Sequence, residues 1–315
     1  MTERPRALGL DQLSPIGPAV ICLGVFDGVH AGHAAMLRAT REAAQARDTA
    51  SVALVFDPPP DEVLRPGALV PRLAPLETVL ARIAGDHGIS AAVPLRFDDE
   101  LRTHSAEAFV GELAPAIELR ALVMSPESAF GRGREGTVDR MRQIGLQRGF
   151  DVIAVDRVIV DGAPVTSTRI RVAIAAGEIA AAGAMGYPPR LEGTVIPGDR
   201  RGRELGFPTA NLAFDYLPAM PPLGIYVGRV GVAERHVGPG HPALVSIGVR
   251  PTFHEHGQVL VEAYLLDYDG DLYGASLALD LLARLRDERR FANVDELVSQ
   301  MRRDEAEARA RLGMR

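Results

Sequence analysis

Two histidines, His30 and His33, stand three residues apart in the run GVFDGVHAGH at positions 24–33. The run follows an apolar segment that is typical of a buried strand, and it opens a helical segment. Free backbone N–H groups and the helix dipole favour an anion at such a helix start, and both imidazoles can donate hydrogen bonds to phosphate oxygens. Gly28 and Gly32 allow the backbone to approach a phosphate closely. The run therefore predicts a phosphate-binding loop.

Two other interpretations of this run stay open. In one, the glycines only form a tight turn and the histidines lie at the surface. In the other, the histidines bind a metal. Metal binding is the weaker interpretation, because no carboxylate or thiol stands at ligand spacing on the same helix.

A second group of polar side chains lies in the run GDRRGRELGFPTANL at positions 198–212. Its three glycines, with arginines between them, predict a flexible loop able to wrap phosphates. Thr209 and Asn211 are two residues apart, so in an extended segment they point to the same side. Their oxygens suit magnesium and ATP phosphate, since magnesium prefers hard oxygen ligands. Taken alone, the run also fits a turn-rich loop with a polar edge strand.

Glu262 interrupts the apolar run VLVEAYLL at positions 259–266. A charged residue in such a strand faces either solvent or a site.

The absence of lysine narrows the chemistry further. All 35 basic residues other than histidine are arginines. A P-loop needs a Gly-Lys-Ser/Thr sequence and a protein kinase needs a lysine on its third strand, so both classes are excluded. Any phosphate must be bound by arginine, histidine, helix N-termini and magnesium.

The elements that must position these residues differ between the two halves of the chain. Residues 19–25, 51–56, 91–94, 121–124 and 152–155 are predicted strands, and residues 33–47, 75–87, 105–113 and 138–149 are the helices between them. This alternation predicts an α/β domain with a parallel sheet covered on both faces, whose ligands lie beyond the carboxyl ends of the strands.

After a break at positions 186–189, strand-like segments follow one another without helices between them, at 191–196, 224–232, 244–249, 259–266 and 276–282. They predict a small antiparallel barrel. Residues 294–312 carry acidic residues early and arginines late, which predicts a closing helix whose charges suit its dipole.

Composition indicates a soluble cytoplasmic protein. The formal net charge is -6, which argues against a nucleic-acid binder. No apolar segment follows the first residues as a signal peptide would require, and the longest apolar stretch, 172–185, is too short to span a bilayer. The single cysteine, Cys22, excludes an intrachain disulfide and a cysteine zinc cluster, and its place in the first strand predicts a buried structural thiol.

The histidine run resembles the G-x-F-D-G-V-H-x-G-H signature of prokaryotic bifunctional riboflavin kinase/FAD synthetases, within the nucleotidylyltransferase superfamily. Near the end of the same domain, VTSTRIR at positions 165–171 resembles the Ser-Ser-Thr-Arg-Ile-Arg motif of that family. Ser167 or Thr168 is expected to cap a helix, and Arg169 to stabilise charge on the ATP phosphates. The resemblance implies nucleotide binding by Gly24, Phe26, Asp27, Gly28, Gly32, Ser167 and Thr168, with His30, His33 and Arg169 as catalytic residues.

The middle of this half departs from the family pattern. Where the family has Phe-Asp-Pro-His-Pro after the second strand, this chain has Pro59 in place of histidine. The family's G-x-D-F-x-F-G appears as SPESAFG at positions 125–131, in which Glu127 is expected to replace the acidic residue. These positions flank the nucleotide and flavin pockets in the family.

The glycine-rich run at 198–211 is similar to the riboflavin kinase signature G-x-x-x-G-R-x-L-G-F-P-T-A-N. Residues 248–253 match G-x-x-P-T-F, and Glu262 falls on the strand that carries the family's catalytic glutamate. Family segments also match 271–274 and 285–291, and Arg286 is the expected isoalloxazine contact, with a solvated charge cluster as the alternative. The resemblance implies binding of substrate by Gly198, Gly202, Arg203, Gly206, Pro208, Thr209, Asn211 and Arg286, and of magnesium by Thr209 and Asn211.

The resemblance implies a Rossmann-like nucleotidylyltransferase domain at 1–186 and a six-stranded antiparallel barrel with a terminal helix at 187–315. The expected activities are phosphorylation of riboflavin to FMN and adenylylation of FMN to FAD, with ATP as co-substrate and Mg²⁺ as cofactor. The alternatives are a riboflavin kinase with a degenerate N-terminal domain and a non-catalytic flavin-binding module. Small molecules are the expected partners, without nucleic acid or membrane, and the expected state is a monomer or weak homo-oligomer.

Overall fold

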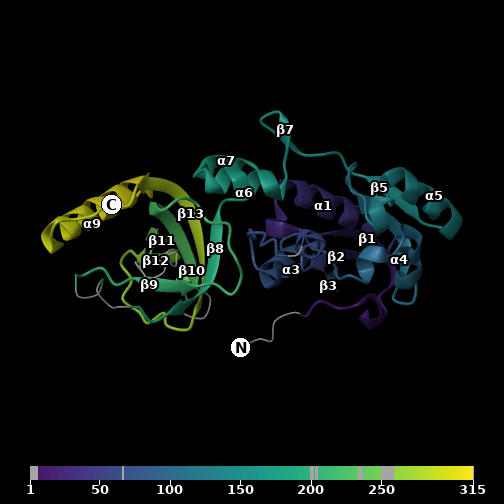
Figure 1. The fold of residues 1–315 in the computed structure, drawn as a ribbon, viewed down its shortest axis with the longest axis horizontal. Coiled ribbons are helices and arrows are strands. Elements are labelled where there is room, and N and C mark those ends of the chain that lie inside the picture. Colours follow the sequence, from purple (N-terminus) through teal and green to yellow (C-terminus); the bar gives the residue numbers. More distant parts are fainter. Residues whose placement is uncertain are drawn as a thin grey trace. The chain divides into compact units, whose positions relative to one another are not determined.

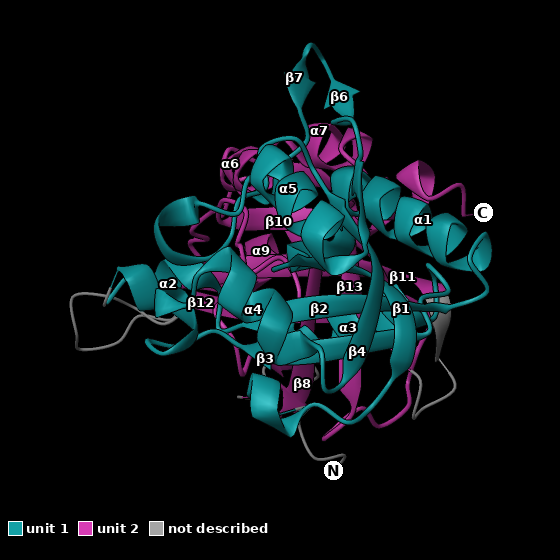
Figure 2. Cartoon of the chain, turned by 90° about the vertical axis from the view of Figure 1, so that its right-hand side faces the viewer, with its two compact units in different colours: residues 1–70, 75–167 teal, residues 71–74, 168–315 magenta. Residues whose placement is uncertain are grey.

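The computed structural model describes residues 6–65, 67–198, 202, 205–232, 237–249 and 259–314. The chain divides into two compact units, coloured separately in Figure 2. Unit 1 contains residues 1–70 and 75–167, and unit 2 contains residues 71–74 and 168–315. The predicted domain boundary at residue 186 assigns residues 168–186 differently, and it stays a prediction.

Unit 1 is built on a parallel sheet of five strands in the order β3-β2-β1-β4-β5. The strands are β1 (Gly17–Gly24), β2 (Ala50–Asp57), β3 (Ala91–Arg96), β4 (Ile117–Met124) and β5 (Asp151–Ala154). The helices of the unit are α1 (Ala31–Gln45), α2 (Pro60–Leu64), α3 (Leu76–Ala84), α4 (Ala106–Leu113) and α5 (Val138–Arg148). A short hairpin of β6 (Ile159–Val160) and β7 (Ala163–Pro164) follows β5 (Figure 1).

The strand order places a topological switch point between β1 and β4. From β1 the chain continues to β2 and β3 on one side, whereas β4 and β5 lie on the other side. Ligands of open α/β sheets bind beyond the carboxyl ends of the strands at such a point. The loop of the two histidines follows β1, and the 125–131 segment follows β4, so both predicted segments leave the sheet there.

The core of unit 1 explains the apolar runs of the sequence. Residues 19–22 of β1 and 52–55 of β2 are fully buried, as expected for strands covered on both faces. Polar residues begin the helices: the side chains of Ser105 and Thr137 cap α4 and α5 through the N–H groups of Ala108 and Arg140. Cys22 is 0% exposed, and burial raises the pKa of its thiol to about 12, which confirms the predicted structural role.

Unit 2 is a closed six-stranded barrel in the order β10-β11-β12-β9-β8-β13, with antiparallel neighbours throughout. Its strands are β8 (Arg190–Ile196), β9 (Ala210–Ala213), β10 (Gly224–Val232), β11 (Val237–Val249), β12 (Val259–Leu265) and β13 (Ser276–Arg286). Two helices precede the barrel, α6 (Ser167–Ala175, whose first residue belongs to unit 1) and α7 (Ile179–Ala184), and α9 (Val294–Arg311) follows it. The predicted fold class is confirmed.

Alternation along the barrel strands separates core from surface. On β12, Val261, Ala263 and Leu265 are buried in the barrel core. Successive side chains of a strand point to opposite faces, so Glu262 and Tyr264 lie on the outer face. Tyr264 packs there in a cluster with Leu244 of β11 and Ala308 of α9. Helix α9 therefore covers part of the outer face of β11 and β12.

Among the described residues, no helix is both long enough and apolar enough to cross a membrane.

Candidate active sites

The loop between β1 and α1 has an unusual backbone. Phe26, Gly28 and Val29 all have positive φ angles, of 53°, 76° and 48°. Only glycine adopts this region without cost, and a β-branched residue such as valine is a clear outlier there. Strained backbone of this kind persists where the surrounding structure enforces it, often at functional sites. Phe26 is fully buried, and its ring lies 5.2 Å from that of His33.

His30 ends this loop as the N-cap of α1. Its Nδ1 accepts a hydrogen bond from the backbone N–H of His33 at 3.4 Å, so the ring proton is on Nε2. The rings of His30 and His33 stack with centroids 3.7 Å apart. A Cβ at Gly32 would lie 3.2 Å from Cε1 of His30 and 3.4 Å from the carbonyl oxygen of Val165. Glycine at position 32 thus leaves room for the stacked pair.

His33 is held in its neutral form. Burial lowers the pKa of His33 well below its ordinary value, and the charges of His30 and His87 lower it further. Its Nδ1 is buried and has no hydrogen-bond partner among the described residues. A neutral imidazole donates one hydrogen bond, which is the property that the sequence prediction requires of it.

The structure brings the two predicted motifs of unit 1 together. The hydroxyl of Ser167, from the second motif, donates to the carbonyl oxygen of Asp27 at 3.3 Å. Arg82 of α3 donates to the carbonyl oxygen of Gly28 at 3.2 Å. Two segments distant in sequence, those of Arg82 and Ser167, therefore contact residues 27–28. Arg82 was missed by the sequence analysis, because nothing in α3 distinguishes it from a surface arginine.

Thr168, Arg169 and Glu127 are further predicted residues of this site, and the described contacts of Thr168 and Glu127 are with residues outside the histidine loop. Thr168 and Arg169 follow Ser167 in the first turn of α6 and belong to unit 2; Thr168 accepts a hydrogen bond from Arg171 at 3.3 Å. Glu127 is exposed in the loop after β4, where it forms an ion pair with Arg157. The carbonyl oxygen of Glu127 also accepts from Arg134 at 3.3 Å. The roles of these residues stay predictions.

The barrel carries a cavity of about 870 Å³ that is large enough for a small ligand. Seven of the predicted site residues line it: Gly198, Gly202, Pro208, Thr209, Asn211, Glu262 and Arg286. Gly206 lies beside them in a turn with φ of 85° but does not line the cavity. Arg203 lies outside the described residues, and so do residues 250–253 of the segment that matches G-x-x-P-T-F.

A polar row crosses three neighbouring strands at this cavity. Glu262 of β12 is directly opposite Asn211 of β9 on one side and Ser246 of β11 on the other. Directly opposite residues have Cβ atoms about 4.5–5.5 Å apart, and all three line the cavity. Thr209 donates from its hydroxyl to Oε1 of Glu262 at 3.3 Å. Glu262 thus faces the cavity. The sequence analysis missed Ser246, because its position opposite Glu262 depends on strand pairing that no local sequence pattern reveals.

Two glycines make space around the predicted magnesium ligands. A Cβ at Gly198 would overlap the side-chain amide of Asn211, and a Cβ at Gly202 would overlap the carbonyl oxygen of Phe207 and touch Oγ1 of Thr209. Gly198 and Gly202 therefore pack directly against Asn211 and Thr209, and a bulkier residue at either glycine would displace them.

The oxygens at this point fit magnesium. Thr209, Asn211 and Glu262 offer a hydroxyl, an amide and a carboxylate oxygen on one cavity wall, and magnesium binds through few protein oxygens together with substrate phosphates and water. A dedicated cluster of three or more histidine, cysteine or carboxylate ligands is absent from the described residues.

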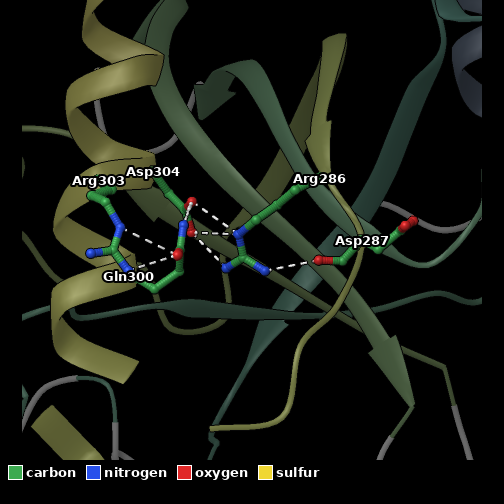
Figure 3. A network of polar contacts seen from close by, with 5 residues as sticks. All are labelled: Arg286, Asp287, Gln300, Arg303 and Asp304. Atoms are coloured by element: carbon green, nitrogen blue, oxygen red, sulfur yellow. Dashed lines mark hydrogen bonds and ion pairs between the residues drawn. The ribbon is translucent and has the colours of Figure 1, made fainter. Parts of the chain in front are cut away.

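Arg286, the last residue of β13, also lines the cavity. It is directly opposite Ile225 of β10, which is itself directly opposite Ser246 of the polar row, and its side chain is engaged by α9. Its guanidinium donates to both carboxylate oxygens of Asp304, with Nε–Oδ1 at 2.9 Å and Nη2–Oδ2 at 2.6 Å (Figure 3). The neighbouring Glu288, Arg289 and Arg290 are exposed. A solvated charge cluster therefore describes Glu288, Arg289 and Arg290, but not Arg286. Contact between Arg286 and an isoalloxazine stays a prediction.

Comparison with known proteins gives consistent matches over both units. The family model described as FAD synthetase matches residues 14–169, and the one described as riboflavin kinase matches residues 185–312. The chain is 33% identical to the bifunctional riboflavin kinase/FMN adenylyltransferase of Escherichia coli (strain K12), over 97% of each chain. It is 35% identical to the protein of that name from Pseudomonas fluorescens, over 96% of each chain. A crystal structure described as a macrolide-efflux protein from Streptococcus pneumoniae superposes with a TM-score of 0.86 at 28% identity, covering 96% of this chain and 98% of that one.

Proposed function

The chain belongs to the family of bifunctional riboflavin kinase/FMN adenylyltransferases, and we propose that the barrel cavity is its kinase site and the histidine loop its adenylyltransferase site. The enzyme phosphorylates riboflavin with ATP to give FMN, and it joins FMN to AMP from a second ATP to give FAD and pyrophosphate. The kinase-only alternative is not supported, because the FAD synthetase model matches residues 14–169.

One observation carries the assignment of the kinase site: Thr209, Asn211 and Glu262 lie together on one wall of the barrel cavity. Phosphoryl transfer requires mainly positioning and charge stabilisation. Glu262 takes the proton from the riboflavin 5′-hydroxyl as that oxygen attacks the γ-phosphorus of ATP, and ADP leaves. The hydroxyl of Thr209, through its hydrogen bond to Oε1, orients the carboxylate for this step.

Thr209 and Asn211 are the proposed magnesium ligands of this site, with the phosphates of ATP completing the coordination. Bound there, magnesium neutralises charge on the transferring phosphate. Gly198 and Gly202, which pack against these two side chains, hold them in place.

In the adenylyltransferase site the phosphate of FMN attacks the α-phosphorus of ATP directly. His30 presents its Nε2–H, because its Nδ1 is occupied by the N–H of His33. His33 donates as a neutral imidazole, and Arg169 contributes positive charge. Gly24, Gly28 and Gly32 keep side chains away from the phosphates, and Asp27 and Ser167 hold the loop closed through their hydrogen bond.

We also propose the partners, the compartment and the oligomeric state of the enzyme. Its partners are small molecules rather than nucleic acid, consistent with a net charge of -6. A single buried cysteine suits the reducing cytoplasm. We expect a monomer or a weak homo-oligomer, which sedimentation of the purified protein would decide.

Chromatography of the flavins formed from riboflavin, ATP and magnesium tests both activities at once. We expect FMN to appear first and FAD to follow. FMN that accumulates without FAD, also when FMN itself is supplied, would contradict the adenylyltransferase assignment. Absence of both products would contradict the proposal as a whole.

A further inference from the structure

Arg286 and Asp304 join the end of the last barrel strand to the middle of α9. The pair is bidentate, and its side chains are only 14% and 6% exposed. Gln300, one turn earlier on the helix, donates to Oδ1 of Asp304 at 2.8 Å and accepts from Arg303 at 2.9 Å. The remaining arm of Arg286 donates to the carbonyl oxygen of Asp287 at 2.8 Å. Figure 3 shows these contacts converging from strand, loop and helix.

Arg286 and Asp304 flank residues 287–303, so their ion pair joins the two ends of this segment. The segment forms one wall of the proposed kinase cavity. Five cavity-lining residues belong to this segment: Glu288, Arg289, Phe291, Leu297 and Met301. Leu297, Met301 and Asp304 follow one another at spacings of four and three, so they share one face of α9. The Arg286–Asp304 pair therefore links this face of α9 to the end of β13.

The C-terminal half of α9 is attached independently. Ala308 is buried in a cluster with Val227 and Leu244 of the barrel. Arg309 binds Asp267 through two hydrogen bonds of 2.9 and 2.6 Å. Loss of the Arg286–Asp304 pair would thus leave the helix attached while releasing its N-terminal half, where the cavity wall lies.

We propose that Asp304, supported by Gln300, is a positioning residue for riboflavin binding: by holding Arg286 it sets the place of the apolar wall formed by Phe291, Leu297 and Met301. This inference rests on the proposed kinase function of the cavity. The planar ring system is the apolar part of riboflavin, so it is the part that this wall contacts. The proposed phosphate-handling side chains, Thr209, Asn211 and Glu262, lie at the start of β9 and on β12 rather than on β13 or α9.

The test is the kinetic effect of Asp304→Asn in the full chain. An interaction that is equal in the ground and transition states raises KM without changing kcat. We expect the KM for riboflavin to rise about tenfold or more, with kcat within about threefold and the KM for ATP within about twofold. Asp304→Glu, which keeps the carboxylate, should recover much of the riboflavin KM. Adenylylation of supplied FMN reports on unit 1 and should be unchanged.

Asp267→Asn is the matched control. It is the same substitution in a second bidentate pair between the barrel and α9, and Asp267 does not line the cavity. An unchanged riboflavin KM in Asp304→Asn, or an equal rise in Asp267→Asn, would overturn the inference. If Asp304→Asn fails to fold, Gln300→Ala decides, because it keeps the ion pair: we expect a KM rise of about threefold, and an unchanged KM contradicts the inference. Wild-type protein that makes no FMN would instead refute the proposed function.

Discussion

Ser167 and Asp27 are 140 positions apart in the sequence, and the hydroxyl of the first donates to the carbonyl oxygen of the second at 3.3 Å. The contact joins the start of α6 to the loop that ends in His30. It brings Ser167 of the second motif, at the end of unit 1, next to the histidine loop near the start of the same unit.

Ser167→Ala should reduce FAD synthesis and leave riboflavin phosphorylation intact. A hydrogen bond of this kind contributes about 1 kcal/mol, which corresponds to a decrease of about fivefold in kcat/KM for FMN. Ser105→Ala is the control, since it removes the cap of α4 in the same unit without touching the loop. Equal losses in the two variants would indicate a general effect on stability.

Glu262→Gln should lower kcat of the kinase about 10²- to 10⁴-fold, the range for loss of a general base. The amide keeps the size of the side chain, so the riboflavin KM should stay within about threefold. FAD formation from supplied FMN should not change. Glu305→Gln, a carboxylate of α9 that pairs with Arg309, is the control. A kcat within twofold of wild type would show that Glu262 is not the base.

Ser246→Ala tests the polar row across β9, β12 and β11. Ser246 is directly opposite Glu262 and lines the same cavity. We expect kinase kcat/KM to decrease about three- to tenfold, which is the effect of one hydrogen bond. Ser246→Thr keeps the hydroxyl and should retain more activity than the alanine variant. Equal activity in all three proteins would remove Ser246 from the site.

The depressed pKa of His33 predicts a loss of stability in acid. Below its ordinary value of 6.5 the imidazole of the unfolded chain binds a proton, whereas the buried ring does not. The free energy of unfolding of unit 1 should therefore be constant above about pH 7 and decrease as the pH falls below 6.5. Denaturant titrations at a series of pH values between 5 and 8 measure this free energy of unfolding. His33→Asn should flatten the dependence; His87→Asn, whose imidazole also has a lowered pKa, should flatten it less. An identical slope in wild type and His33→Asn would contradict the prediction.

Cys22 should be unreactive in the folded protein. Its thiol is fully buried and burial raises its pKa to about 12, so almost no thiolate exists at neutral pH. A colorimetric thiol reagent should detect no thiol in native protein and one thiol per chain in denaturant. Rapid labelling of the native chain would show that β1 opens locally.

Much of the fold could be predicted because its signals are local. The apolar runs of β1, β2 and β4 and the helices between them follow from periodicity, and so does α9. Strand β9 was missed among the predicted strands because it is only Ala210–Ala213, short and preceded by a glycine- and proline-containing loop. The prediction of 244–249 captured only the end of β11, which extends from Val237 to Val249.

The site was predictable where its residues stand close together in the sequence. Thr209 with Asn211 and His30 with His33 are recognisable from spacing and from family resemblance. Ser246, Arg82 and Asp304 are not, because each reaches its site through a long-range contact: strand register, a helix packed on a loop, and an ion pair across 18 positions. In the sequence Asp304 belongs to a run of alternating charges that is typical of a solvated helix.

The pairing of β8 with β13 closes the barrel of unit 2, and it also determines when that barrel can form. One edge of β8 pairs early, with β9, but its other edge pairs with residues 276–280 of β13. During synthesis the barrel therefore cannot close until nearly the whole unit has left the ribosome. The sheet of unit 1, whose strands end by residue 154, can assemble well before that. The enzyme should thus acquire its adenylyltransferase fold first and its kinase fold last, and nascent chains truncated before β13 should contain a compact N-terminal half followed by an open, protease-sensitive remainder.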